Sequence, residues 1–364
     1  MSSSAIPITS YPRRPTRAEE DADSVDAVRS QIGLRYRTRR LNRRNILYGL
    51  LFIASIPVLY FFLFWAPRRD SSVYVITPTV KVQDYPTKLM PQTEEGRLVF
   101  IGDIHGCNVE FAQLLEEVQF VPSRDRLILV GDFISKGPDS IAVMEIAMKN
   151  NAMCVRGNHE NTLLRRYAKK HGQKFDNDLE SGDFNPEEEG FIHILADEKK
   201  IIKKATQEQL KFIDSCPMIL RMPEKIFGED HGEVSVCHAG LMWNVPTLED
   251  QDSAVLLYIR TLLPPDNSTA SPTRDGILWK EVWNDYQETL SPSERRTVIY
   301  GHDAKTGLAI KEFSKGLDSR CYKGDYLTAM VVKRNGFGGW EHDLVSVKCQ
   351  IHDPKLPGYV DGKL

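Results

Sequence analysis

Five short apolar runs, rich in valine, isoleucine and leucine, recur along the chain, and each ends in glycine or another small residue beside a polar side chain. Runs of this length bounded by glycine are typical of strands that are buried on both faces. The runs are LVFIGDIHG (98–106), LILVGD (127–132), MCVRGNHE (153–160), VSVCHAG (234–240) and TVIYGH (297–302).

A segment with helical spacing follows each of the first three runs. Apolar residues stand at i, i+3, i+4 and i+7 in Phe111, Leu114, Leu115 and Val118, and the segments 140–149 and 161–170 are similarly helical. The order β-α-β-α-β-α predicts an α/β fold with parallel strands and crossover helices. In such folds ligands bind at the carboxyl ends of the strands.

An uncharged stretch of 21 residues, ILYGLLFIASIPVLYFFLFWA, extends from Ile46 to Ala66. At about 1.5 Å per residue, a helix of this length crosses a hydrocarbon core of about 30 Å. A cleaved signal peptide would have a shorter apolar region followed by a small-residue cleavage site. We therefore expect an uncleaved transmembrane signal anchor over 46–66. The alternative is a buried core helix.

Arginines flank this stretch unevenly, with six between residues 35 and 44 and only Arg68 and Arg69 close behind it. The positive-inside rule predicts a single-pass type II membrane protein whose N-terminus is cytosolic. We expect five parts in chain order: a disordered cytosolic tail (1–45), the anchor (46–66), a proline-containing lumenal stem (67–94), the catalytic domain (95–350) and a C-terminal tail (351–364).

Two further features bear on the compartment. Asn267 begins an N-glycosylation acceptor, Asn-Ser-Thr, in a loop-like stretch that fits the lumenal side, and a chance match is the alternative. The six cysteines contain no C-x-x-C pair, so neither a zinc ribbon nor a disulfide-dense fold is indicated. Cys321 can pair with Cys349 in an oxidising lumen. Three cysteines beside the strand motifs are expected to be small buried core residues: Cys107, Cys154 and Cys237.

The charge is distributed unevenly along the chain. The 364 residues are 41% hydrophobic and 27% charged with a net charge of −3, which is ordinary globular composition. Residues 1–45 carry an excess of +5 and residues 46–66 no charge, so residues 67–364 hold −8. A nucleic-acid binder would need a basic face, so we expect no nucleic-acid partner. Any anionic substrate must be held by local groups.

Side chains that can bind metal follow each of the five runs. Taken singly, each is more often a turn residue or a hydrogen-bonded histidine, but burying all of them is costly unless a cation pairs with them. Mixed carboxylate, amide and imidazole ligands favour two Zn, Mn, Fe or Co ions over an all-oxygen Mg or Ca site. The candidates are Asp103, His105, Asp132, Asn158, His159, His238 and His302.

The motifs GDIHG, GDF-x-x-K-G, GNHE, HAG and GH, in this order, resemble the calcineurin-like metallophosphoesterases over about residues 97–335. The resemblance is to the branch shared by Ser/Thr phosphoprotein phosphatases and diadenosine-tetraphosphatase-like enzymes. The stretches YGHDAKTGL (300–308) and KGLDSRCYKGDYLTAM (315–330), with the anchor, are similar to the fungal vacuolar zinc-dependent endopolyphosphatases. The family implies a four-layer αββα sandwich with a two-metal site at the strand ends.

The resemblance also implies a role for each candidate residue. Asp103 and His105 would hold one divalent ion. The second ion would be held by Asn158, His238 and His302. Asp132 would bridge the two ions. The two ions, zinc first among the candidates, supply an activated water for in-line attack on phosphorus. His159 would be the general acid and Arg156 the phosphate clamp.

The chain departs from the protein phosphatases where they read GD-x-x-D-R-G. Here Ser135 and Lys136 stand in place of the Asp and Arg. The expected general acid His159 therefore lacks a charged partner, and Lys136 offers phosphate a single cationic group in place of the two-pronged guanidinium of an arginine. Both changes favour phosphoanhydrides, whose leaving group needs less protonation. Arg320 replaces the glycine of a D-[ST]-G motif. A lysine-rich insertion is either a solvated helix face or a cationic track for a polyanion, and its lysines are Lys169, Lys170, Lys199, Lys200, Lys203 and Lys204.

These observations favour a metal-dependent phosphoanhydride hydrolase. The first expectation is an endopolyphosphatase that hydrolyses inorganic polyphosphate in an organelle lumen such as the vacuole, with a membrane anchor. The alternatives within enzymes are a Ser/Thr protein phosphatase and a dinucleoside polyphosphate hydrolase. The alternative from another class is a catalytically inactive membrane scaffold, which we would expect to have lost one or more ligands.

Overall fold

The computed structural model describes residues 43–60, 73–175 and 195–359. The chain divides into two units, Met1–Ser71 and Ser72–Leu364. In the first unit, helix α2 (Arg43–Tyr60) contains Pro57. Within the described ranges, no helix combines the length and the apolar character needed to cross a membrane. The last six residues of the predicted span 46–66 lie outside these ranges, as does nearly all of the predicted N-terminal tail 1–45.

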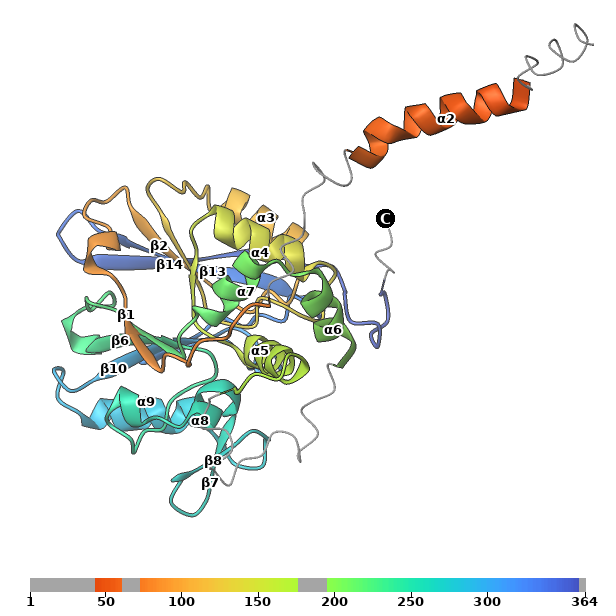
Figure 1. Ribbon diagram of the computed structural model, residues 1–364. Helices are drawn as coiled ribbons and strands as arrows, with labels where there is room; N and C mark the ends of the chain where they lie inside the picture. The colour runs from red at the N-terminus through yellow and green to blue at the C-terminus, as the bar shows by residue number, and fades with distance from the viewer. Residues whose placement is uncertain (1–42, 61–72, 176–194, 360–364) are drawn as a thin grey trace, which may run out of the picture. The chain divides into compact units, whose positions relative to one another are not determined.

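Two mixed β-sheets form the centre of the second unit (Figure 1). The first sheet has the order β14-β13-β2-β3-β4 and the second the order β1-β5-β6-β10-β12-β11. The strands of the first sheet are β2 (Arg97–Ile101), β3 (Arg126–Leu129), β4 (Met153–Cys154), β13 (Tyr326–Arg334) and β14 (Trp340–Lys348). Those of the second are β1 (Val82–Asp84), β5 (Ile219–Arg221), β6 (Glu233–Cys237), β10 (Arg296–Tyr300), β11 (Ala309–Ile310) and β12 (Ser314–Gly316).

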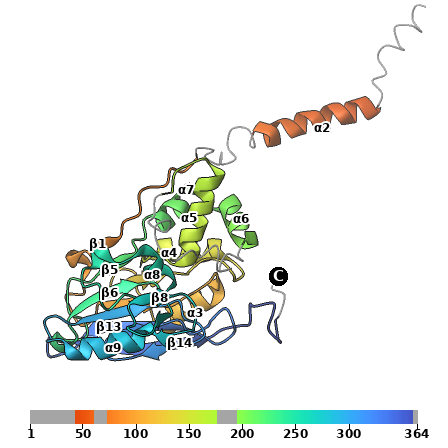
Figure 2. The same ribbon diagram turned by 90° about the horizontal axis from the view of Figure 1, so that it is seen from below.

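The remaining elements are helices and one small sheet. The helices are α3 (Asn108–Glu117), α4 (Ser140–Lys149), α5 (Asn158–Lys170), α6 (Leu195–Lys204), α7 (Gln207–Asp214), α8 (Ser253–Tyr258) and α9 (Trp279–Thr289). The small sheet has the order β8-β7-β9, with β7 (Thr261–Leu263), β8 (Thr269–Ser271) and β9 (Ile277–Leu278). Figure 2 shows α4, α5, α6 and α7 grouped at one side of this unit.

The order β2, α3, β3, α4, β4, α5 matches the predicted alternation, and β2-β3 and β3-β4 are parallel. The buried core has three parts, which explain the layers. In β2, Val99 and Ile101 pack with the helices α3, α4, α5 and α7, whereas Leu98 and Phe100 pack against the second sheet. A third cluster joins α8 and α9 to the far face of the second sheet. The predicted α/β fold is confirmed, and its layers run α, β, β, α.

The segment 73–94 differs from the predicted stem because it packs onto the rest of the second unit. The Tyr74 amide donates to the Tyr167 hydroxyl at 2.9 Å, and the Thr77 amide and hydroxyl both donate to Asp214 Oδ2 at 2.8 Å. Strand β1 then pairs in parallel with β5. The compact unit therefore starts near residue 72 instead of 95. Proline content suggested a linker, but long-range partners give these backbone groups their hydrogen bonds.

Two disulfides join distant parts of this unit. Cys321 pairs with Cys349, the pairing that the sequence left possible. Cys154 is buried in the core, as predicted, and it also pairs with Cys216, which the sequence did not indicate. The ends of β4 and α7 meet only in the folded chain, which is why sequence spacing gave no sign of this bond. Cys107 and Cys237 are buried free thiols, as predicted.

Candidate metal centre

The carboxyl ends of strands from both sheets meet the start of α5 at one site. Asp103 follows β2, His238 follows β6 and His302 comes shortly after β10, while Asn158 and His159 begin α5. The site is almost closed to solvent, because His238 is 0% and His302, the most exposed of its histidines, only 8% exposed. The arrangement of the strand ends thus brings the predicted polar residues together at one site.

Two groups of possible ligands overlap at Asp132. His105, Asp132 and His159 form one group and Asp132, His238 and His302 the other, and within each group the ligand atoms lie within 4.8 Å of one another. Asp132 is therefore the only residue common to both groups. This is the position that the predicted bridging role requires.

The other predicted ligands lie beside these groups. The distance from His105 Nε2 is 3.9 Å to Asp103 Oδ2 and 3.7 Å to Asp132 Oδ2. His238 Nε2 lies 3.0 Å from Asn158 Oδ1 and 3.2 Å from His302 Nδ1. The fold thus brings all six predicted ligands together, and His159 lies beside them. The role of each of these residues remains a prediction.

The backbone at the site is held in an unusual conformation. His105, Asp132 and His302 have φ values of 48°, 49° and 69°, a region that non-glycine residues rarely adopt. Such strain persists only where surrounding contacts hold it, and it is common at functional sites. At Asp132 the side chain of Glu160 supplies such contacts, whereas the His302 amide donates to Asp103 Oδ1 at 3.1 Å and the His105 amide donates to the Asp132 backbone oxygen at 2.9 Å.

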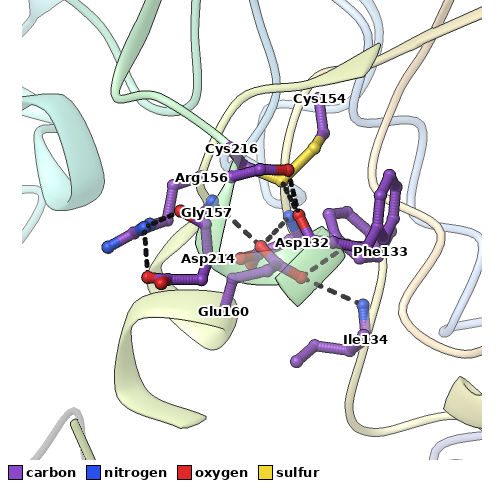
Figure 3. The surroundings of a disulfide bond; sticks show 11 residues. Asp132, Phe133, Ile134, Cys154, Arg156, Gly157, Glu160, Asp214 and Cys216 are labelled. Carbon is purple, nitrogen blue, oxygen red and sulfur yellow. Dashed lines mark hydrogen bonds and ion pairs between the residues drawn. A yellow bond between two sulfur atoms is a disulfide. The ribbon is translucent and has the colours of Figure 1, made fainter. Parts of the chain in front are cut away.

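Glu160 is completely buried and accepts hydrogen bonds from four backbone amides (Figure 3). Its Oε2 accepts from Asp132 at 2.8 Å and Gly157 at 2.9 Å, and its Oε1 accepts from Phe133 at 3.1 Å and Ile134 at 3.2 Å. The sequence reasoning missed this residue. Its signal was present, because a glutamate at the third position of a helix commonly caps the helix start.

Burial and neighbouring charges shift the pKa values at the site. Burial, followed by the charges of Asp318 and Asp132, raises the pKa of Asp103. Burial and the nearby Lys136 lower the pKa of His159 to about 3, and burial lowers that of His302. Against the effect of burial, the charge of Asp132 raises the pKa of His238. The site therefore combines buried carboxyl groups with imidazoles whose pKa values are shifted in opposite directions.

This donor set fits divalent transition-metal ions. Within the described part of the chain, three buried atoms at the site have no hydrogen-bond partner: His159 Nδ1, His302 Nε2 and Asp318 Oδ2. Buried polar atoms without partners are rare in folded proteins, and buried charges need compensation. A cation bound among the carboxylate and imidazole groups would compensate these charges.

Asp318 and Arg260 belong to the site although the sequence reasoning did not select them. Asp318 is buried and its Oδ1 accepts from the Arg320 amide at 3.1 Å. Arg320 has a φ of 66°, a backbone conformation that favours glycine, and its guanidinium pairs with Asp325. Burial and then the charge of Arg260 lower the pKa of His302.

Arg156 does not have the geometry of a phosphate clamp. Its guanidinium is completely buried and donates from Nη2 to the Asp214 backbone oxygen at 2.7 Å and from Nη1 to Thr79 at 2.9 Å (Figure 3). The prediction that Arg156 contacts phosphate is therefore wrong. Its hydrogen bonds instead join α7 and residue 79 to the segment that carries Asn158. Closeness in sequence to Asn158 could not reveal the direction of this side chain.

Lys136, in contrast, lies in the site. Its Nζ is 2.8 Å from His105 Nε2, and burial lowers its pKa. Ser135 is buried, and its hydroxyl has no hydrogen-bond partner among the described residues. The lysine is thus positioned to contact an anion at the metal centre, while Ser135 gives His159 no charged support.

The comparisons with known proteins agree with this site. Residues 96–337 match the calcineurin-like phosphoesterase family model. The zinc-dependent endopolyphosphatase of Saccharomyces cerevisiae is 27% identical over 82% of this chain and 95% of its own length. A symmetrical bis(5'-nucleosyl)-tetraphosphatase from Shewanella sp. is 28% identical over 43% of this chain and 49% of its own length. A crystal structure named as a candidate diadenosine tetraphosphatase has a TM-score of 0.54 and 27% identity, over 74% of this chain and 98% of that one. With the family motifs gathered around one buried site, the chain belongs to the calcineurin-like phosphoesterases.

Proposed function

We propose that this chain is an endopolyphosphatase, a metal-dependent hydrolase that cuts phosphoanhydride bonds inside inorganic polyphosphate. The observation that carries the proposal is the alignment with the yeast endopolyphosphatase over nearly its full length. The position of Lys136 at the metal centre supports it, because a point cation can contact a flexible phosphate chain without selecting one terminal group.

Two ions, with zinc as the first candidate, would be held by the six predicted ligands: Asp103, His105, Asp132, Asn158, His238 and His302. When bound, such ions polarise phosphoryl oxygens and lower the pKa of water. Lys136 and Arg260 would orient the substrate through its oxygens. His159, whose pKa is low in the free protein, would take up a proton when the anionic substrate binds beside it and give that proton to the departing oxygen. A departing phosphate chain is a stable anion, so the missing charged partner at Ser135 costs little.

The nearest alternative is a dinucleoside tetraphosphate hydrolase. The Shewanella relative and the solved structure favour it, since both carry that name and both resemble this chain. A protein phosphatase is disfavoured by Ser135 and Lys136. A catalytically inactive scaffold is disfavoured because every predicted ligand is present and lies at one site.

The test uses the full chain, stripped of metal by a chelator and reloaded with Zn, Mn, Co or Fe in separate samples. Each sample receives long polyphosphate, diadenosine tetraphosphate or a phosphopeptide, and polyphosphate products are separated by length on a gel. We expect intermediate lengths before free phosphate accumulates. Monophosphate from the outset, without shortened chains, would contradict internal cutting. Hydrolysis of diadenosine tetraphosphate alone would favour the alternative.

We also propose that residues 46–66 anchor the protein as a single-pass type II membrane protein and that the catalytic unit faces an organelle lumen, the vacuole first. The uneven arginines support this orientation. The two disulfides fit an oxidising compartment. Protease treatment of intact vesicles should remove only the N-terminal tail. Digestion of the catalytic unit under those conditions would reverse the proposed orientation.

A further inference from the structure

A group of possible metal ligands lies outside the metal centre, at the start of α3. It consists of Cys107, Glu110 and His352, whose ligand atoms all lie within 4.8 Å of one another. Among the described residues, it is the only such group that shares no member with the metal centre. We call it the α3 cluster.

The sequence places two of these side chains on one face of α3. Cys107 stands directly before the helix and Glu110 three residues later, a spacing that brings side chains to the same side of a helix. Both are buried, with exposed fractions of 0% and 1%. The Cys107 thiol is not in a disulfide, and its hydrogen bond to the His105 backbone oxygen is long, at 3.9 Å. A sulfur held so weakly can turn toward an ion.

The third member, His352, comes from the segment after β14, and long-range contacts fix its position. The Cys321–Cys349 disulfide holds the start of this segment. The His352 amide donates to the Tyr322 backbone oxygen at 3.0 Å. His352 Nε2 then lies 3.0 Å from Glu110 Oε1. The fold therefore presents the imidazole to α3 through a covalent bond and a backbone hydrogen bond.

One carboxylate oxygen of the cluster lacks a partner. Glu110 Oε1 accepts from the Gln350 amide at 3.1 Å and faces His352, whereas the buried Glu110 Oε2 has no hydrogen-bond partner among the described residues. Burial raises the pKa of Glu110, but the bonds from His352 and from the Gln350 amide outweigh it and lower that pKa below its ordinary value. Buried polar atoms are nearly always hydrogen-bonded. The contact between Glu110 and His352 therefore does not account for Oε2.

We propose that the α3 cluster binds a further divalent ion, zinc first, through Cys107, Glu110 and His352. Thiolate, imidazole and carboxylate are the ligands that zinc takes in proteins, whereas magnesium and calcium take oxygen ligands. Zinc ligands stand at about 2.0 to 2.3 Å, so two ligands of one tetrahedral ion are about 3.5 Å apart. Atoms within 4.8 Å of one another need only small side-chain rotations to reach this spacing.

The ion would give Glu110 Oε2 a partner and join the C-terminal segment to the start of α3. Zinc binds the thiolate, so the Cys107 proton passes to solvent when the ion binds. The His352 side chain is 15% exposed, so a water molecule would complete the coordination. This site is independent of the substrate proposed above.

The test uses cobalt as a spectroscopic probe for zinc. The full chain is stripped of metal by a chelator and reloaded with Co²⁺, and the near-ultraviolet absorption band of a cobalt–thiolate bond is recorded. No predicted ligand of the metal centre is a cysteine, so this band reports a site outside that centre. The zinc content per chain is measured in parallel, after dialysis against a defined zinc concentration.

Two variants change the cluster and two matched controls change the same residue types elsewhere. Cys107→Ala removes the thiol, and His352→Gln removes the imidazole at a partly exposed position. The controls are Cys237→Ala, the other buried free thiol, and His342→Gln, an exposed histidine of β14. Neither control residue belongs to a group of possible ligands in the described ranges. Circular dichroism checks that each variant is folded.

We expect the band in wild type and in both controls, and its loss in Cys107→Ala. His352→Gln should bind cobalt at this site at least tenfold more weakly, since losing even an outer partner of a ligand costs about 10- to 100-fold. Each cluster variant should retain one zinc ion fewer per chain than wild type. If Cys107→Ala fails to fold, the cobalt titration of His352→Gln decides alone.

Two results would overturn the site. The first is a cobalt-loaded wild type without the band, or equal zinc contents in wild type and both cluster variants, which would leave Glu110 and His352 as an ion pair only. The second is a band that disappears in Cys237→Ala and persists in Cys107→Ala. Neither result would touch the proposed hydrolysis of polyphosphate.

Discussion

Replacing both cysteines of the Cys154–Cys216 disulfide by alanine should lower the free energy of unfolding by about 4 kcal/mol. The bond joins residues 62 apart in sequence. For a loop of this size, the chain-entropy relation gives a loss of roughly 14 cal/mol/K in the unfolded state, which is about 4 kcal/mol at 25 °C. Alanine is preferred to serine because both cysteines are buried, and a buried hydroxyl would add its own cost.

The same variant should also weaken metal binding. Cys154 comes four residues before Asn158, and Cys216 comes two residues after Asp214, the partner of Arg156. Without the disulfide, the Arg156–Asp214 contact must hold α7 against the segment that carries Asn158. We therefore expect a lower zinc content after dialysis against a defined zinc concentration.

The assay is unfolding in urea, followed by tryptophan fluorescence at a fixed zinc concentration, since bound ligand itself adds stability. The matched control is the double alanine variant of Cys321 and Cys349, whose bond joins residues 28 apart. The same relation gives about 3.5 kcal/mol for that loop. A loss below about 1 kcal/mol in the Cys154/Cys216 variant, with the full loss in the control, would refute the entropic argument. An unchanged zinc content would refute the link to Asn158.

Four further predictions follow from the site and its surroundings. Asp132→Asn should reduce turnover below a tenth of wild type, with the circular dichroism spectrum unchanged, because one residue serves both ligand groups; higher activity would contradict the bridging role. His159→Gln should lower turnover by about 10² to 10⁴ with metal content retained, and loss of metal would make it a ligand instead. Asn267→Gln should abolish an endoglycosidase-sensitive mobility shift; a shift that persists would place the glycan elsewhere. Hydrogen bonds from Arg97 and from the Val121 amide outweigh the effect of burial and lower the pKa of Asp125 in the folded state. The stabilising contribution of Asp125 is therefore present above its unfolded-state pKa and is lost as the pH falls through the lower folded-state pKa. Asp125→Asn should make the free energy of unfolding depend less steeply on pH in that range, and a pH dependence parallel to that of wild type would count against this.

Much of the fold and of the candidate site could be predicted from local sequence. The apolar runs predicted β2, β3, β4, β6 and β10, because buried strands need continuous hydrophobic side chains. The polar residues after them came together because neighbouring strands in an α/β fold end at the same edge. This geometric rule needs no knowledge of side-chain packing, so it selected the seven candidate residues that the structure brings to one site.

Only the tertiary structure decided which long-range partners the other residues have. Arg156 precedes a predicted ligand yet pairs with Asp214, and Cys154 forms a bond with Cys216, which follows a distant helix. Residues 73–94 pack on the domain because Asp214 accepts hydrogen bonds from Thr77 and because β1 pairs with β5. Side-chain direction and the pairing of distant segments depend on how whole layers pack. That information is spread over the chain, and no local pattern contains it.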